Sequence, residues 1–164
     1  MVTSRSRFPL FVLFLFLLSL LLEGCLTGTR YLSTPSVATG VHADIFNFSD
    51  GEINPEKVDQ LYLEVAHLLA ITPDRSTRRP RVLVVSPTHI HKEYLRLRPS
   101  AKTQNGIAIA LYIPHEDKIL IPHFDRILLA HEFAHYFTFH HLSVPRFKWE
   151  EIADKIQDTV TTVR

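Results

Sequence analysis

The chain has 164 residues, enough for one domain and a short additional segment. It carries 18 Lys and Arg residues against 17 Asp and Glu residues, for a formal net charge of +1. This balance argues against an electrostatic nucleic-acid binder, which would show a strong basic excess on one face. Ten histidines are a high count, and they raise the chance that a metal-binding pattern arises by coincidence.

Residues 1–22 have the pattern of a secretory signal. Arg5 and Arg7 supply a basic n-region, and residues 8–22 form an apolar h-region of fifteen residues. That length is short for a membrane-spanning helix, which needs about 20 residues. An ordinary cleaved signal and an uncleaved N-terminal anchor are the two alternatives.

The next four residues, Leu22-Glu23-Gly24-Cys25, contain the only cysteine of the chain. They resemble a bacterial lipobox, in which the cysteine is acylated and becomes the mature N-terminus. The resemblance implies a lipoprotein-type signal peptide over residues 1–24, lipidation of Cys25 and a domain held in the cell envelope. Leu26 after the cysteine slightly favours the outer membrane.

Residues 26–51 are rich in Thr, Ser, Gly and Pro, with few apolar side chains. We expect residues 25–51 to form a lipid-anchored tether, since a flexible segment of this size reaches on the order of 25–30 Å. The folded domain is then expected over residues 52–164.

A first helix is predicted from Pro55, with Asn54 as its N-cap and Thr72-Pro73 at its end. Apolar residues repeat along it at spacings of three and four. Residues 81–86 form a β-branched run between two prolines and predict a strand. Residues 88–99 have weak helical character.

Two further strands are predicted over residues 107–113 and 118–122, joined by a turn at residues 114–117. They imply a small, mostly antiparallel sheet. A long apolar helix follows from the N-cap Asp125 to about His141, and a second helix is predicted over residues 147–160. The fold class is therefore expected to be α+β.

The long helix carries the pattern His131-Glu132-Phe133-Ala134-His135. Two histidines four residues apart share one helix face, so both imidazoles can reach one metal ion at about 2.0–2.1 Å. Glu132 projects about 100° further round the helix, where a carboxylate can accept a proton from a water on that metal. The pattern predicts a Zn²⁺ site with Glu132 as the general base.

Two residues compete for the place of third ligand. His141 follows His131 at the spacing of the metzincin motif, but Thr138 occupies the position where that motif has a glycine. If the helix continues, His141 lies about 80° round from His131 and more than two turns along, too far to bind the same ion. Glu150 on the next helix is the preferred candidate.

The stretch Glu150-Glu151-Ile152-Ala153-Asp154 resembles the Glu-x-x-[Ser/Ala]-Asp stretch of the gluzincin metallopeptidases. The resemblance implies a minimal zincin-like domain, with the sheet packed on a buried metal helix and a following ligand helix. It implies that Glu150 is the third zinc ligand and that Asp154 orients a ligand histidine. Glu151 as the ligand, and Asp154 as a direct ligand, are the alternatives.

These features predict a membrane-anchored zinc metallopeptidase that acts on a peptide or protein substrate. An extended substrate is expected to pair with an edge strand in the region 107–121. A second oxyanion donor is open among four residues: Tyr112, His115, His123 and Tyr136. The alternatives are a non-catalytic envelope lipoprotein whose zinc site is structural or vestigial, and a regulatory lipoprotein that binds a partner protein.

Overall fold

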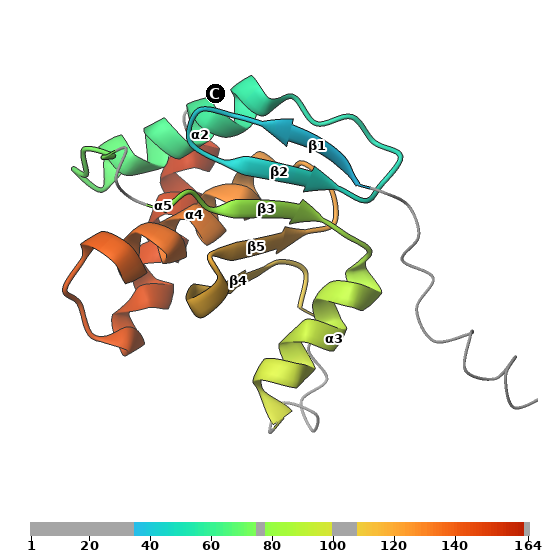
Figure 1. Cartoon of the computed structure of the whole chain (residues 1–164). Helices are drawn as coiled ribbons and strands as arrows, with labels where there is room; N and C mark the ends of the chain where they lie inside the picture. Colours follow the sequence, from blue (N-terminus) through green and yellow to red (C-terminus); the bar gives the residue numbers. More distant parts are fainter. Residues whose placement is uncertain (1–34, 75–77, 100–107, 163–164) are drawn as a thin grey trace, which may run out of the picture. The chain divides into compact units, whose positions relative to one another are not determined.

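A five-stranded mixed sheet forms one layer of the domain (Figure 1). Its strands, in spatial order, are β1 (Ser36–Thr39), β2 (Asp44–Asn47), β3 (Arg81–Val84), β5 (Lys118–Ile121) and β4 (Leu111–Ile113). Strands β2, β3 and β5 run parallel, whereas β1 and β4 are antiparallel to their neighbours and form the two edges. The structure, a computed structural model, describes residues 35–74, 78–99 and 108–162.

The α+β class is confirmed, but the expectation of a mostly antiparallel sheet is wrong. Helix α2 (Pro55–Leu68) connects β2 to β3, and a crossover of this kind makes the two joined strands parallel. Strand β5 also pairs in parallel with β3. Only the β4–β5 pair, joined by the 3₁₀ turn η2 (Pro114–Glu116), has the expected antiparallel hairpin form.

The expected tether is also too long, because strands β1 and β2 lie within it. These strands pair over four residues each, and β2 buries Ile45 and Asn47 against the domain. The domain therefore starts before residue 52. The predicted signal peptide, Cys25 and residues 25–34 of the predicted tether lie outside the described residues.

Helix α2 begins where the sequence predicts, because the Asn54 side chain accepts a hydrogen bond from the backbone N–H of Glu56. It ends at Leu68, before the predicted Thr72-Pro73. Ala70 adopts a left-handed conformation with φ of 55°, and its N–H donates to the carbonyl of His67. The N–H of Ile71 donates to the carbonyl of Ala66, which completes a Schellman motif.

The other three helices are α3 (Pro87–Leu97), α4 (Arg126–His141) and α5 (Trp149–Thr162). Asp125 caps α4, as predicted, by accepting hydrogen bonds from the backbone of Ile127 and Leu128. A 3₁₀ turn, η3 (Arg146–Lys148), leads into α5, which packs along α4. Within the described residues, no helix has both the length and the apolar character needed to cross a bilayer.

The main core lies between the sheet and helices α2, α4 and α5 (Figure 1). Alternate residues of β3 show why: Val82 and Val84 face this core, while Leu83 packs on the opposite face of the sheet. Helix α4 contributes four large, fully buried hydrophobic side chains, Leu129, Phe133, Tyr136 and Phe137.

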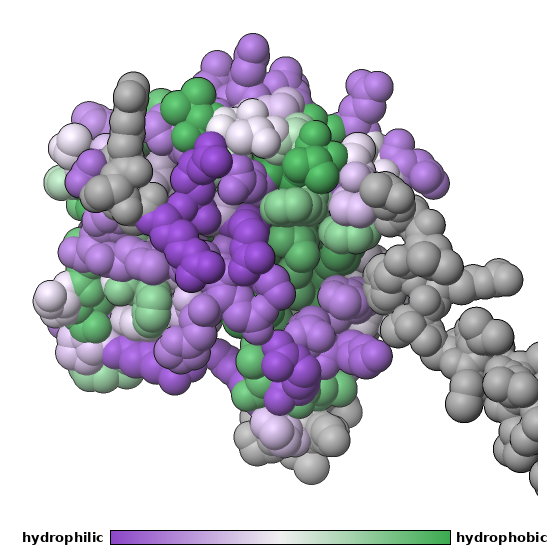
Figure 2. All heavy atoms as spheres, in the orientation of Figure 1, coloured by the Kyte–Doolittle hydropathy of each residue, from purple (hydrophilic) through white to green (hydrophobic). Residues whose placement is uncertain are grey.

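Helix α3 packs on the opposite face of the sheet. Its Ile90 is buried in a smaller cluster with Val85, Ile113 and Leu120. Figure 2 shows hydrophobic atoms exposed over the strands beside hydrophilic ones, in the orientation of Figure 1. Strand β4 forms one edge of the sheet. It packs against α3 on one face of the sheet and against α4 on the other.

Candidate metal centre

The two histidines of the His-Glu-x-x-His pattern converge as the sequence predicts. The Nε2 atoms of His131 and His135 lie 3.1 Å apart, and each side chain is about 15% exposed. Both residues belong to α4, whose opposite side is held in the main core by Phe133 and Phe137. The burial of that opposite side fixes the direction in which the histidines point.

Glu150 completes a group of three possible ligands from the first turn of α5. Its Oε1 lies 3.4 Å from His131 Nε2, and its Oε2 lies 3.4 Å from His135 Nε2. The ligand atoms of the three residues all lie within 4.8 Å of one another. None of the three alternatives, His141, Glu151 and Asp154 as a direct ligand, is a member of this group.

The donor set and its spacing fit zinc. Tetrahedral ligands at about 2.0–2.2 Å from Zn²⁺ lie about 3.3–3.6 Å from one another. The separations of 3.1–3.4 Å between the two Nε2 atoms and the Glu150 oxygens come close to this spacing. Two histidines and one carboxylate also leave a fourth position for a water or a substrate atom, as in catalytic rather than structural sites.

The protonation state of His135 suits a metal ligand. Burial, the neighbouring His131 and the charge of Arg98 together lower the pKa of His135 to about 4. The ring is therefore neutral at pH 7, which is the form that donates a lone pair to a metal.

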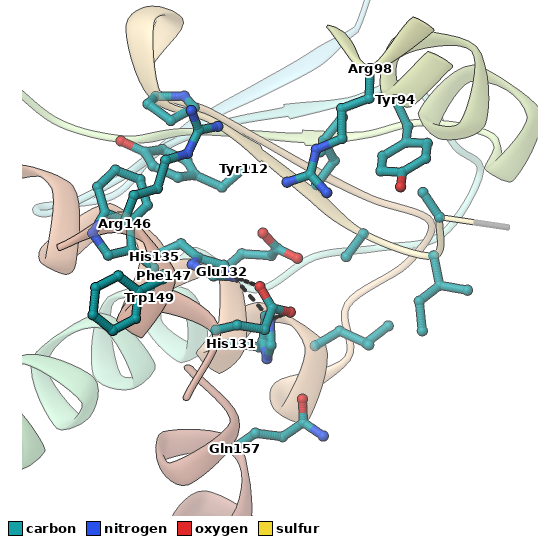
Figure 3. A pocket seen from close by; sticks show the side chains of 17 residues that line it. Tyr94, Arg98, Tyr112, His131, Glu132, His135, Arg146, Phe147, Trp149 and Gln157 are labelled. Carbon is teal, nitrogen blue, oxygen red and sulfur yellow. Dashed lines mark hydrogen bonds and ion pairs between the residues drawn. The ribbon is translucent and has the colours of Figure 1, made fainter. Parts of the chain in front are cut away.

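Glu132 lies beside the ligand group and is only 6% exposed. Burial, followed by repulsion from the Glu150 carboxylate, raises the pKa of Glu132 to about 8, although a hydrogen bond from the Tyr112 backbone acts in the opposite direction. A bound cation nearby would favour the carboxylate form and offset this shift. Figure 3 shows the side chain of Glu132 extending into the pocket in front of the histidines.

Asp154, one turn after Glu150, lies near the far side of the His131 ring. Its Oδ1 is 3.6 Å from His131 Nδ1, which is within ion-pair range but longer than a hydrogen bond. The Nδ1 atom itself is buried without a hydrogen-bond partner among the described residues. Asp154 is therefore placed to orient His131, and this role stays a prediction.

The ligand group lies in a pocket of about 590 Å³. Strand β4 and the residues before it form one wall, α4 forms the floor, and the segment from η3 into α5 forms the opposite wall. The end of α3 contributes Tyr94 and Arg98 (Figure 3). Arg146 and Trp149 extend from the opposite side.

The four proposed oxyanion donors are placed differently. The Tyr136 hydroxyl donates to the carbonyl of Arg78, 2.5 Å away, so it is already engaged outside the pocket. Tyr112 lines the pocket, but its ring packs beside Tyr136 and Phe139 and its hydroxyl is buried. His115 and His123 do not line the pocket.

The sequence interpretation missed Arg98, Arg146 and the aromatic residues beside them. Arg146 follows Pro145 shortly before the ligand helix. Its position near the site could have been inferred, because Pro145 separates the two helices that carry the ligands. Arg98 directly follows α3, which packs on the other face of the sheet, and no local pattern indicates that its side chain reaches the metal site.

Comparisons with family models, with curated proteins and with solved structures found no match to the chain. Its function is therefore inferred from the chemistry of the site.

Proposed function

We propose that the protein is a zinc-dependent peptidase of the gluzincin type. The observation that carries this proposal is the convergence of His131, His135 and Glu150 from two helices, with the buried Glu132 beside them in an open pocket. Zinc, when bound, supplies a Lewis acid that polarises a carbonyl and acidifies a water molecule.

Glu132 acts as the general base and then as the general acid. Its carboxylate accepts the proton of the attacking water and passes it to the leaving amine. The Tyr112 backbone hydrogen bond to Glu132 holds this carboxylate at the pocket wall formed by β4.

Strand β4 supports a peptide as the substrate. It pairs with β5 on one side and forms the edge of the described sheet on the other. Ala110, Leu111 and Tyr112 line the pocket, so an extended peptide added to this edge would pass the ligand group. Backbone pairing of this kind presents a peptide bond to Glu132 whatever the side chains of the substrate are.

A purely structural zinc site is less well supported. Structural zinc is usually enclosed by four protein ligands, whereas Glu150 is 71% exposed and the group has three members. A structural site also has no use for a buried carboxylate such as Glu132. We further propose that acylation of Cys25 anchors the domain in the cell envelope, where it meets its substrate.

Metal removal tests the proposal. The zinc-loaded chain is incubated with a mixture of peptides in water enriched in ¹⁸O, and the products are read by mass spectrometry. We expect cleavage with ¹⁸O in the new carboxyl termini, loss of cleavage with a chelator, and recovery when zinc is restored. Products that form equally well in the chelated sample would refute a zinc peptidase.

A further inference from the structure

The two arginines that line the metal pocket differ from the other described arginines. The structure describes seven arginines, and five of them bond to a carboxylate or to a backbone carbonyl. These five are Arg78, Arg79, Arg81, Arg96 and Arg126. Among the described residues, only Arg98 and Arg146 lack such an acceptor, and both line the pocket.

Each of these two arginines lies over an aromatic ring. The guanidinium of Arg98 lies 5.4 Å from the ring centroid of Tyr94, and that of Arg146 lies 5.9 Å from the centroid of Trp149. Such contacts orient a guanidinium without using its N–H donors. The N–H donors of both guanidinium groups therefore remain available to a ligand.

The two arginines approach the site from different sides. Figure 3 shows Arg98 extending from the end of α3 towards Glu132, whereas Arg146 of η3 lies beside Trp149, the first residue of α5. The pocket also contains the carboxylates of Glu132 and Glu150, but neither forms an ion pair with these arginines in the structure. Glu150 instead faces the two histidines.

With a zinc ion bound, the net charge of the pocket would be positive. The two glutamates balance the two arginines, so a divalent cation leaves a net positive charge in a partly enclosed space. A neutral peptide would leave both guanidinium groups without an anionic partner. A carboxylate can accept two parallel N–H bonds from one guanidinium, which is the strongest common pairing for this side chain.

We infer that Arg98 and Arg146 bind carboxylates of the substrate, so that the enzyme cleaves peptides carrying a carboxylate within about two residues of the cleaved bond. This inference rests on the proposed peptidase function. The carboxylate can belong to an Asp or Glu side chain or to the C-terminus of the substrate. Each residue of an extended peptide advances about 3.3 Å, so only groups close to the cleaved bond remain inside the pocket.

Cleavage-site profiling tests this inference. The zinc-loaded full chain digests a mixture of peptides, and each cleaved bond is read by mass spectrometry. Three matched peptides around a preferred bond are then compared: an acidic one with an amidated C-terminus, a neutral one with a free C-terminus close to the bond, and a neutral amidated one. Preference for the first or the second identifies the source of the carboxylate.

Arg98→Gln and Arg146→Gln are the test variants, and Arg96→Gln is the matched control. Arg96 lies in the last turn of α3, two residues before Arg98, but it bonds to Glu93 and Glu116 and does not line the pocket. We expect each test variant to lose about tenfold in kcat/KM on the carboxylate-bearing peptide and less than twofold on the neutral amidated one. Arg98→Lys should recover part of the preference, and Arg96→Gln should keep all of it.

A binding measurement separates this inference from the peptidase proposal. Trp149 is the only tryptophan of the chain and lines the pocket, so its fluorescence reports peptide binding. In zinc-loaded Glu132→Gln, we expect the preferred carboxylate-bearing peptide to bind about tenfold more tightly than the neutral amidated one, and Arg98→Gln to remove the difference. If the carboxylate-bearing peptide binds more tightly in this way but the wild type cleaves no peptide, only the proposed peptidase function is refuted. Equal loss on all three peptides, or cleavage without any preference for carboxylates, would refute the carboxylate inference.

Discussion

Glu150 and His131, which lie on different helices, place a carboxylate oxygen 3.4 Å from an imidazole nitrogen. Helix α5 carries the Glu150 carboxylate and helix α4 carries the His131 imidazole, so a metal ion bound by both side chains would join the two helices. Metal binding and folding should therefore be linked in this protein.

We predict that zinc raises the melting temperature of the chain. At a free zinc concentration about a thousandfold above the Kd, the gain is about 4 kcal/mol, or roughly 10 °C for a domain of this size. Glu150→Gln should remove most of this shift, because it takes away one of three ligands. Glu151→Gln is the control, since Glu151 is exposed and outside the ligand group. An equal zinc shift in both variants would contradict the assignment of Glu150.

Asp154→Asn should weaken zinc binding without removing it. A carboxylate that orients a ligand histidine typically contributes about 10–100-fold in metal affinity. Competition with a chromophoric chelator measures the affinity, and Asp158→Asn, one turn further along α5, serves as the control. If both substitutions leave the affinity unchanged, the separation of 3.6 Å between Asp154 and His131 has no role in metal binding.

The metal-free protein should lose stability between about pH 6.5 and pH 8. The pKa of Glu132 is raised from 4.5 to about 8, so over that range the folded state keeps a proton that the unfolded chain has released. Stability therefore falls as the pH rises through this window. The pKa of His135 is lowered from 6.5 to about 4, which has the opposite effect, but only below about pH 6.5.

Urea denaturation in the presence of a chelator, at pH 6.5 and pH 8, measures this loss. Glu132→Gln should flatten the change, because the amide does not titrate. A loss of equal size in the wild type and in Glu132→Gln would show that another group is responsible.

Ala70→Gly should stabilise the fold by roughly 0.5–1 kcal/mol. Ala70 has a φ of 55° in the Schellman motif that ends α2, a conformation that costs an L-residue with a Cβ more than it costs glycine. Ala66→Gly, inside the same helix, is the contrasting variant and should destabilise. Thermal unfolding of both proteins with saturating zinc gives the comparison, and destabilisation by Ala70→Gly would contradict the expected cost of this backbone conformation.

Local chemistry allowed the helices and the two histidine ligand candidates to be predicted. Asn54 and Asp125 are good N-caps in isolation, and each caps its helix in the structure. His131 and His135 need only the helical repeat to share a face. Glu150 could be predicted only because residues 150–154 resemble the ligand stretch of the gluzincins. The spacing from His135 does not by itself indicate a ligand.

Other features depend on contacts between distant parts of the chain. Strand β2 has only four residues, Asp44–Asn47, too few to show a clear periodicity in the sequence. Its Ile45 is buried because it packs in the core shared with α2 and α4. The parallel pairing of β2 with β3 depends on the crossover through α2. Arg98 reaches the pocket because α3 packs beside β4 and β5, and no periodicity in the sequence contains that information.

The central claim is that Glu132 performs chemistry at a zinc ion held by His131, His135 and Glu150. The most direct measurement determines zinc content and peptide cleavage in the same preparations of the wild type and Glu132→Gln. The predicted result is one zinc ion per chain in both proteins and cleavage by the wild type alone. Cleavage by zinc-loaded Glu132→Gln at the wild-type rate, or a wild type that binds no zinc, would contradict the claim.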